Sequence, residues 1–346
     1  MSAFLGVLLH AIGGFAAGSF YIPFKMVKKW SWESAWFVLG VAAWLVVPML
    51  AAAVTVPDLW NTIASADSGT LFWTYFFGVL WGIGGLTFGL TMRYLGVSLG
   101  MTVALGFTAA FGTLIPPIYY GKFGDLLNTQ SGLVTLAGVL LSLVGIAVCG
   151  KAGTMKEQEL DDEAQKESIA EYDLKKGLII ASVSGILSAC FAFALQAGGP
   201  IAKAAIELGT KDIFQNNAVL VVILLGGITT NGIWSLLLNF KNKTGSDYTN
   251  KNTPLTKNYL WASLGGLTWY LQFFFYGMGV TFLGKKYDFA SWSIHMAFII
   301  FFSNLWGMYF KEWKGVSKKT EAVLFLGLAI IVVAIGMIGL AGYFFG

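Results

Sequence analysis

Charge is scarce in this sequence. Only 12% of its 346 residues are charged, about half of the share that a soluble globular protein carries. Because charged side chains keep a folded surface in water, this low share, together with a hydrophobic content of 56%, excludes an ordinary soluble fold. We therefore expect most of the chain to lie in a lipid bilayer, which is its first expected partner.

Cysteine and histidine are also rare, with two of each. Cys149 and Cys190 lie inside apolar runs, so we expect neither a disulfide framework nor a Cys-x-x-Cys metal site. No GxSxG, HExxH or GxxxxGK[ST] motif occurs, which argues against the hydrolase, metalloprotease and ATP-driven chemistries that these motifs support. We expect no enzyme, no cofactor and no metal. A net charge of only +4 also argues against nucleic acid as a partner.

The sequence is rich instead in long apolar runs. One membrane-spanning helix takes about 20 predominantly apolar residues, and ten such runs follow one another along the chain. They lie near residues 3–24, 35–56, 71–91, 97–120, 132–150, 177–197, 216–240, 259–283, 289–310 and 321–345. The sequence therefore predicts an all-α integral membrane protein with ten transmembrane helices.

Basic residues are divided unequally between the two sets of alternate connections. Seventeen of the 22 Lys and Arg residues fall in one set, and five fall in the other. Cytoplasmic loops are enriched in Lys and Arg, and an even number of spans leaves both termini on the side that is poor in them. We therefore expect both termini to be extracytoplasmic.

A charge-rich stretch at residues 155–171 separates five predicted spans from the other five. We expect a first five-helix repeat at 1–150, a charged cytoplasmic linker at 151–176 and a second five-helix repeat at 177–346. An odd number of spans inserts the second half upside down relative to the first. Aligning the halves pairs Gly14 with Gly185 and Gly82 with Gly265, in the order that two inverted repeats require.

Few ionisable side chains occur inside the predicted spans, and those that do are functional candidates because charge is costly there. His10 and His295 lie well inside the first and ninth spans, and Asp288 begins the ninth. Histidine titrates near physiological pH and suits proton coupling. A histidine hydrogen-bonded between two helices is the alternative interpretation. Asp288, Trp292 and His295 have the spacing to face one cavity.

The eighth predicted span carries rings and hydrogen-bonding groups at mid-depth. Trp269, Gln272 and Tyr276 are spaced by three and four residues, which places them on one helix face, and Tyr270 is a neighbour. Flat rings beside an amide in a shielded pocket suit a sugar. An aromatic packing stripe with one satisfied glutamine is the alternative.

Tyr21, Lys25, Glu33 and Arg93 lie at the predicted cytoplasmic ends of the spans. The usual role of such residues is an interfacial belt, in which long basic side chains reach out to water. A gate formed by pairing Lys25 with Glu33 is the functional alternative.

Six strings are specific enough to indicate a family. They are FYIPFKMVKKWSWE at Phe20–Glu33, GLTMRYLGVSLG at Gly89–Gly100, DLKKGL at Asp173–Leu178, GGLTWYLQFFFYGMG at Gly265–Gly279, YDFASWSIHM at Tyr287–Met296 and KEW at Lys311–Trp313. These strings closely resemble the bacterial L-rhamnose–proton symporter family of the drug/metabolite transporter superfamily. The resemblance implies ten helices in two inverted repeats and uptake of L-rhamnose with a proton across the bacterial inner membrane, with a central cavity open to one side at a time.

With that solute, the candidate residues take on expected roles. We expect the sugar contacts to be Gln272, Trp269, Tyr270, Tyr276, Trp292 and Trp81. We expect the coupled proton on His295, Asp288 or His10, and the cytoplasmic-end or gating residues to be Lys25, Glu33, Arg93 and Tyr21.

The chain departs from the family pattern at residues 85–88, which read Gly-Leu-Thr-Phe where we expect amides and a hydroxyl. A different deoxysugar or hexose therefore stays open as the solute. An exporter on the same scaffold and a non-transporting membrane sensor are the alternatives to uptake.

Overall fold

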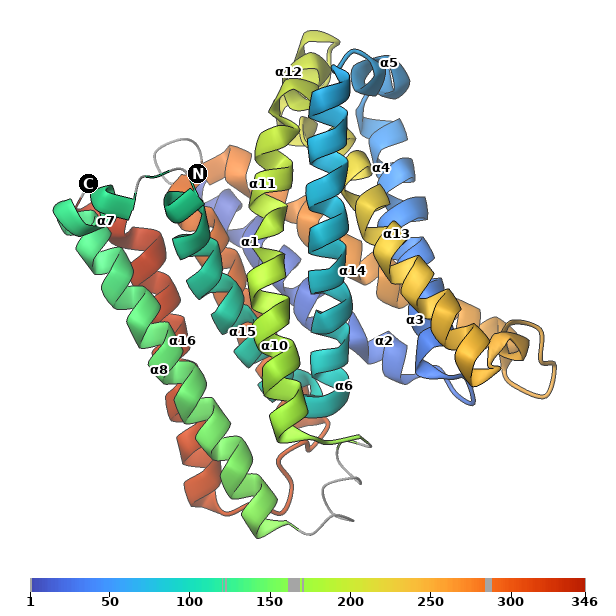
Figure 1. The fold of residues 1–346 in the computed structure, drawn as a ribbon, viewed down its shortest axis with the longest axis vertical. Helices are drawn as coiled ribbons and strands as arrows, with labels where there is room; N and C mark the ends of the chain where they lie inside the picture. The colour runs from blue at the N-terminus through green and yellow to red at the C-terminus, as the bar shows by residue number, and fades with distance from the viewer. Residues whose placement is uncertain are drawn as a thin grey trace.

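The computed structural model describes residues 2–119, 121, 123–160, 169, 171–283 and 288–345, and over these residues the chain forms helices and connections without any strand. Figure 1 shows the long helices packed side by side. In chain order they are α1 Ser2–Ser19, α2 Tyr21–Lys25, α3 Trp32–Gly40, the π-helix η1 Val41–Val46, α4 Val47–Thr55, α5 Leu59–Ala64, α6 Ser68–Tyr119, α7 Phe123–Asn128, α8 Gln130–Glu159, α10 Leu174–Ser188, α11 Cys190–Ala197, α12 Gly199–Glu207, η2 Asp212–Phe214, α13 Asn217–Asn242, η3 Gly245–Tyr248, α14 Leu255–Leu283, α15 Asp288–Tyr309 and α16 Lys318–Phe345.

Seven stretches of the described chain are helical, long and apolar enough to cross a membrane. The all-helical membrane class predicted from the sequence is therefore confirmed. One of the seven, Ser68–Gly112, has 45 residues, more than twice the roughly 20 that one crossing requires.

This long stretch belongs to α6, which is interrupted at Gly96. Gly96 has a φ of 81° and a ψ of 176°, a backbone conformation that only glycine adopts readily. A Cβ placed on Gly100 would lie 3.1 Å from the carbonyl oxygen of Thr91, although nine residues of straight helix would separate them by about 13 Å. The chain therefore turns back at Gly96, and α6 consists of two antiparallel arms (Figure 1).

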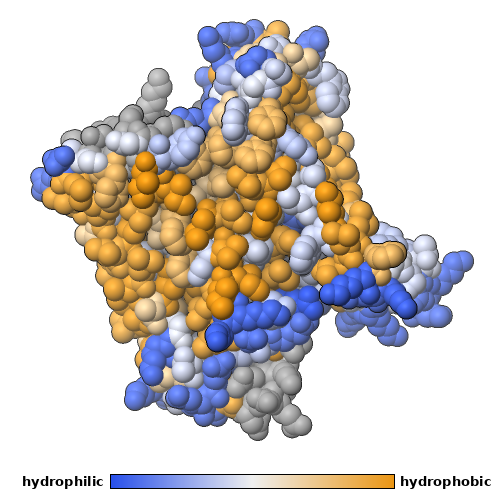
Figure 2. All heavy atoms as spheres, viewed as in Figure 1, coloured by the Kyte–Doolittle hydropathy of each residue, from blue (hydrophilic) through white to orange (hydrophobic). Residues whose placement is uncertain are grey.

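The outer surface of the bundle is apolar. Figure 2 shows hydrophobic residues gathered across the middle of the visible face, with hydrophilic residues at its two ends. Large exposed side chains from many helices contribute to this surface, among them Leu50, Phe72, Leu140, Ile233 and Leu237. A monomeric soluble protein rarely exposes apolar patches beyond a few hundred Å², so this surface is suited to lipid.

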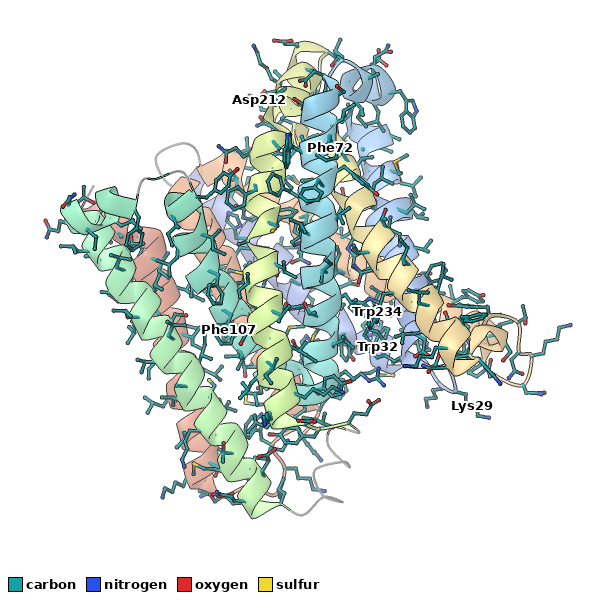
Figure 3. The ribbon with its side chains drawn as sticks, in the orientation of Figure 1. Lys29, Trp32, Phe72, Phe107, Asp212 and Trp234 are labelled. Carbon is teal, nitrogen blue, oxygen red and sulfur yellow. The ribbon has the colours of Figure 1, made fainter. Side chains whose placement is uncertain are left out.

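The predicted connections lie at two opposite ends of the bundle. Figure 3 places Lys29 and Trp32 at one end and Asp212 and Phe72 at the other. Both chain termini lie toward the end that carries Asp212 (Figure 1). The helix α8 continues to Glu159, so the start of the predicted linker is helical, while residues 161–168 and 170 lie outside the described residues.

Side-chain caps fix several helix starts. The Ser31, Thr129 and Asp173 side chains accept hydrogen bonds from backbone N–H groups in the first turns of α3, α8 and α10. Each cap satisfies a donor that has no partner within its own helix. These residues therefore determine where three of the long helices begin.

The second helical run is irregular in its middle. The π-helix η1 connects α3 to α4, and such segments occur frequently at functional sites. Trp44 of η1 is buried, and its ring centroid lies 5.3 Å from that of Trp269 on α14. The irregular segment thus supports a residue that the sequence predicts to be functional.

Substitution of Gly96 tests the turn in α6. We expect Gly96→Ala to lower the unfolding temperature in detergent by several degrees, because the backbone conformation costs an alanine about 1–3 kcal/mol. The added Cβ would also lie 2.6 Å from Ile169 Cδ1 and 2.8 Å from Glu312 Oε2. Gly112→Ala, in the same helix but with open space around the new methyl group, is the matched control and should leave the melting curve unchanged. Equal melting temperatures for the two variants would contradict the proposed need for glycine.

Candidate functional site

A pocket lies inside the bundle where α1, both arms of α6, the end of α10, α14 and α15 meet. The volume of the pocket is about 70 Å³, several times the roughly 10–15 Å³ that a single water needs. The pocket can therefore hold several waters or one small solute. Its lining residues are Ala17, Phe20, Trp81, Gly85, Phe88, Leu105, Thr108, Ser188, Trp269, Gln272, Phe273, Met296 and Ile299.

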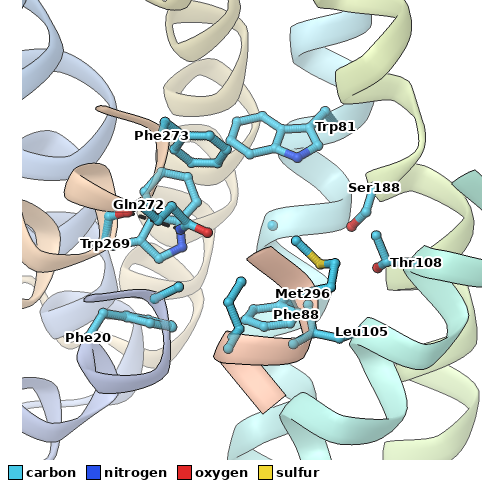
Figure 4. A pocket seen from close by; sticks show the side chains of 13 residues that line it. Phe20, Trp81, Phe88, Leu105, Thr108, Ser188, Trp269, Gln272, Phe273 and Met296 are labelled. Atoms are coloured by element: carbon cyan, nitrogen blue, oxygen red, sulfur yellow. Dashed lines mark hydrogen bonds between the residues drawn. The ribbon is translucent and has the colours of Figure 1, made fainter. Parts of the chain in front are cut away.

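Three large rings form one wall of the pocket. The ring centroids of Trp81 and Trp269 are 5.6 Å apart, and Phe273 lies 5.0 Å from Trp269 and 5.7 Å from Trp81. Figure 4 shows Trp81 and Phe273 together above the pocket and Trp269 beside Gln272. These flat surfaces suit the apolar C–H faces of a small ring.

Polar groups line opposite sides of the same pocket. The Gln272 amide nitrogen donates to the Trp269 carbonyl at 3.0 Å, which leaves its side-chain oxygen to accept. Thr108 donates to the Ala104 carbonyl at 2.9 Å, so its hydroxyl oxygen can also accept. Figure 4 shows Thr108 and Ser188 across the pocket from Gln272. Hydrogen-bonding groups on two sides and rings on a third suit a compact solute with several hydroxyls.

The residues predicted to contact a sugar divide into three groups. Trp81, Trp269 and Gln272 line the pocket. Tyr270 is buried outside the lining, where its ring faces Phe274 at 6.5 Å. Tyr276 lies one helical turn beyond Gln272, beside the histidines. The side chain of Trp292, like that of Asp288, lies outside the described residues.

Sequence reasoning missed more than half of the lining. The apolar members have no polar group that distinguishes them from ordinary packing residues, and a hydroxyl residue within a span is commonly bonded to its own helix. The sequence offers two signals, which are the Thr and Ser residues on neighbouring predicted spans and the departure from the family pattern at residues 85–88. The missed residues are Ala17, Phe20, Gly85, Phe88, Leu105, Thr108, Ser188, Phe273, Met296 and Ile299.

The two histidines of the chain lie together in the fold. The ring centroids of His10 and His295 are 5.8 Å apart, and Tyr276 lies 5.4 Å from His10 and 5.3 Å from His295. Both histidines are buried, and among the described residues neither nitrogen of His10 nor Nδ1 of His295 has a hydrogen-bond partner. Buried polar atoms are normally paired, so the cluster has unused capacity for a proton or a water.

This histidine cluster borders the pocket. A Cβ on Gly13 would lie 2.9 Å from His295 Cε1 and 3.2 Å from the Gln272 carbonyl oxygen. Met296, the neighbour of His295, lines the pocket itself. A change of charge on either imidazole would therefore occur next to the pocket.

At the end of the bundle that carries Lys29, Lys25 does not pair with Glu33. Its ammonium group instead contacts the Glu312 carboxylate at 3.0 Å. Glu33 is buried and accepts hydrogen bonds from Asn242 at 2.8 Å and Thr244 at 3.0 Å. The suggested Lys25–Glu33 pair is wrong for this conformation, because Glu33 fastens α3 to the end of α13.

Arg93 and Tyr21 lie near the same end. Arg93 forms an ion pair of 2.7 Å with Glu171 and lies over the Trp32 ring at 5.5 Å. Tyr21 is buried with its ring 4.9 Å from that of Phe24. Tyr21, Phe24 and Arg93 line a second cavity on this side of the bundle.

The fold and the pocket define a class of protein: a multi-pass helical membrane protein with a solute-sized pocket inside the bundle. Among the described residues, no group of three His, Cys, Asp or Glu side chains could hold a metal. The family model of the L-rhamnose-proton symport protein matches residues 1–343. The chain belongs to this family.

Individual relatives agree with the family match. The chain is 40% identical over 339 residues to the L-rhamnose-proton symporter of Cronobacter sakazakii (strain ATCC BAA-894), and the match covers 97% of both chains. The identity and coverage are the same for the symporters of Yersinia pestis (strain Pestoides F) and Yersinia pseudotuberculosis serotype O:1b (strain IP 31758). No solved structure matches the chain.

Proposed function

We propose that this protein takes up L-rhamnose together with a proton by alternating access. The observation that carries the proposal is the pocket that Trp81, Trp269 and Gln272 line, in a chain that belongs to the L-rhamnose-proton symport protein family. Alternating access requires a central site that communicates with one side of the membrane at a time.

The proposal includes ten spans in two inverted five-helix repeats, on the drug/metabolite transporter scaffold. The two arms of α6 supply two of the spans, and α14 and α15 complete the number. Helix contacts support the repeat, because Gly14 of α1 packs against Phe298 and Ile299 of α15, while Gly185 of α10 packs against Phe107 and Thr108 of α6.

These contacts follow the pairing of Gly14 with Gly185 in the sequence. If the first span corresponds to the sixth, then the helix that packs against the first span must correspond to the helix that packs against the sixth. These two helices are α15, in the place of the ninth span, and the second arm of α6, in the place of the fourth. The pairing of Gly82 with Gly265 agrees with this arrangement. Gly82 packs against α13, in the place of the seventh span, and Gly265 packs against α3, in the place of the second span. An inverted repeat relates equivalent helices in this way.

We place the protein in the bacterial inner membrane with both termini in the periplasm. The basic residues Lys25, Lys29, Arg93 and Lys156 belong to the set of connections that is rich in Lys and Arg, which is the cytoplasmic set in bacterial membrane proteins. Release of the sugar to the cytoplasm therefore requires opening of the end that carries Lys25.

The sugar would lie against Trp269 and Trp81 and hydrogen-bond to Gln272, with Thr108 and Ser188 on the other side. Tyr276 connects this pocket to the histidines. Phe88 and Gly85, which belong to the stretch that departs from the family pattern, also line the pocket. Substitutions at these two positions would therefore be expected to change the selectivity among related sugars.

The proton would bind at His295 or His10, with Asp288 as the third candidate. Symport requires that protonation favours the conformation that binds sugar, and that an empty protonated carrier crosses poorly. The short separation between the histidine cluster and Gln272 supports such linkage, because both ligands act on the same contact of α1, α14 and α15.

Uptake by the purified protein tests the proposed function. In proteoliposomes with an acidic exterior, labelled L-rhamnose should accumulate above its external concentration, and an uncoupler should abolish the accumulation. External addition of L-rhamnose to weakly buffered vesicles should also make the exterior more alkaline. Sugar-driven acidification would indicate an exchanger, and binding without flux would indicate a sensor, so either result contradicts the proposal.

Gln272 tests the sugar pocket. We expect Gln272→Leu to weaken the apparent affinity for L-rhamnose about 10–100-fold, because hydrogen bonds worth about 1–3 kcal/mol are lost while the side-chain size is kept. Concentration dependence of exchange uptake measures this change. Thr268→Val on the same helix is the control, since the Thr268 hydroxyl donates to the Leu264 carbonyl at 2.7 Å and the residue does not line the pocket. An unchanged affinity in Gln272→Leu would exclude Gln272 as a sugar contact.

The proton assignment is tested by separating accumulation from exchange. His295→Ala, His10→Ala and Asp288→Asn are measured for gradient-driven accumulation and for sugar exchange at equal pH. Removal of the coupling group should abolish accumulation and retain exchange, because exchange needs no net proton movement. The assignment is wrong if all three variants still accumulate L-rhamnose.

A further inference from the structure

Glu312 lies where four parts of the chain meet at the end of the bundle that carries Lys25. Its side chain is only 1% exposed. One carboxylate oxygen accepts from Lys25 Nζ at 3.0 Å and from the Val97 N–H at 3.1 Å, and the other accepts from the Ser98 N–H at 3.0 Å. The single acidic group thus binds the end of α2 to the turn inside α6.

The break at Gly96 creates the site that the carboxylate occupies. The first N–H groups of a helix have no partner in that helix, and they form its positive end. Val97 and Ser98 begin the second arm of α6 directly after the break. Glu312 Oε2 would lie 2.8 Å from a Cβ on Gly96, so glycine is needed for this approach. Glu312 therefore caps a helix that is distant in sequence.

The backbone carbonyl of Glu312 is also held by a hydrogen bond. Lys156 of α8 is buried and donates from Nζ to the Glu312 carbonyl at 2.7 Å. The same ammonium group lies 4.9 Å from the Tyr172 ring and 5.2 Å from the Trp313 ring. Glu312 is therefore held at a fixed place between α2, α6 and α8.

This cluster lies along the route from the pocket to the cytoplasmic end. Phe20 and Phe88 line the pocket, whereas Tyr21 and Met92 line the second cavity, together with Lys25, Gly96 and Arg93. The residues that line the two cavities are therefore separated by no more than about one helical turn, both along α1–α2 and along α6. The Glu312 contacts join these same two elements beyond that thin barrier.

We propose that Glu312 is the gate residue of the cytoplasmic side, holding that side closed until it releases Lys25 and the N–H groups of Val97 and Ser98. This role rests on the proposed function, since the direction of release follows from the proposed orientation. Charged hydrogen bonds of this kind are short-ranged and directional. A small outward movement of α2 would break the contact with Lys25, and a movement of the Glu312 segment away from α6 would break the contacts with the Val97 and Ser98 N–H groups.

A thiol reporter in the pocket tests the gate without requiring transport. Ala17, which lines the pocket, is replaced by Cys in a chain that carries Cys149→Ala and Cys190→Ala. A membrane-impermeant thiol reagent is applied from the cytoplasmic face or from the other face of oriented vesicles. We expect Glu312→Gln to raise the rate of labelling from the cytoplasmic face about tenfold and to lower it from the other face, because the closed state loses its charge-assisted contacts.

Two further variants sharpen the result. Lys25→Met leaves the carboxylate on the Val97 and Ser98 N–H groups, so its increase in labelling should be smaller. It also serves as the second test if Glu312→Gln does not fold. Glu207→Gln is the control, because Glu207 forms an exposed ion pair of 3.7 Å with Lys203 within α12. This control should label like the parent.

The gate role is overturned if folded Glu312→Gln and Lys25→Met proteins label from both faces at the parent rates. Labelling requires no sugar and no proton gradient. Uptake is measured on the protein with Ala17 unchanged, and its failure together with the expected labelling of the reporter chain would contradict the proposed solute and leave the gate standing. Normal uptake with unchanged labelling would contradict the gate role and leave the proposed solute standing.

Discussion

The absence of water from the bilayer interior is the constraint on which the rest of this structure depends. A polar group placed there must find a partner inside the protein. Asn231 illustrates the rule, since its amide donates to the Gly82 carbonyl at 2.7 Å and accepts from the Trp36 indole at 3.0 Å. One side chain thereby connects α13, α6 and α3. Polar residues inside the bundle therefore link specific helices to one another through hydrogen bonds.

The same constraint makes the exceptions informative. Among the described residues, the histidine cluster has buried ring nitrogens without partners. Leaving a buried donor or acceptor unpaired costs about 1–3 kcal/mol, which is a large cost for a protein to carry without a function. A proton, a water or a solute hydroxyl would each relieve it. The coupling role that we propose for the imidazoles is consistent with this feature, which Trp44 Nε1 and Tyr270 Oη share.

The helix break at Gly96 satisfies the constraint in a different way. A turn at the membrane boundary exposes N–H groups that a continuous helix would have paired, and the Glu312 carboxylate supplies the missing acceptor. Gly96 and Glu312 lie in two different family strings, Gly89–Gly100 and Lys311–Trp313, and nothing in either string indicates that the two contact each other. The partner lies more than 200 positions away, so only the fold could reveal it.

Sequence reasoning succeeded where one physical property dominates. Hydropathy alone predicted the all-helical membrane class, because burial in lipid requires nearly continuous apolar runs, and seven stretches of the described chain are long and apolar enough to cross a membrane. Helical periodicity placed Trp269 and Gln272 on one face, and both line the pocket. Tyr270 lies about 100° around the helix from Trp269, which explains its absence from the lining.

Sequence reasoning failed where contacts join distant segments. Closeness in sequence suggests Glu33 alone as the partner of Lys25. In the structure, Glu33 is engaged by Asn242 and Thr244, while Glu312 reaches Lys25 from a loop beyond α15. Phe88, Leu105 and Met296 line the pocket with side chains that do not differ from packing residues. Their role depends on how the helices meet, which hydropathy does not encode.

The contact between α1–α2 and the α15 region would connect the proposed proton site to the proposed gate. The two segments touch at successive levels through the bundle, and the pocket lies beside the middle of this contact. Rigid helices transmit a displacement at one level to the others. Under our proposal, a charge gained at the histidines would act on a contact that also borders the pocket and that ends at Lys25 and Glu312. In order, the levels are His10 with His295, Gly14 with Ile299, Ser19 with Trp306 and Lys25 with Glu312.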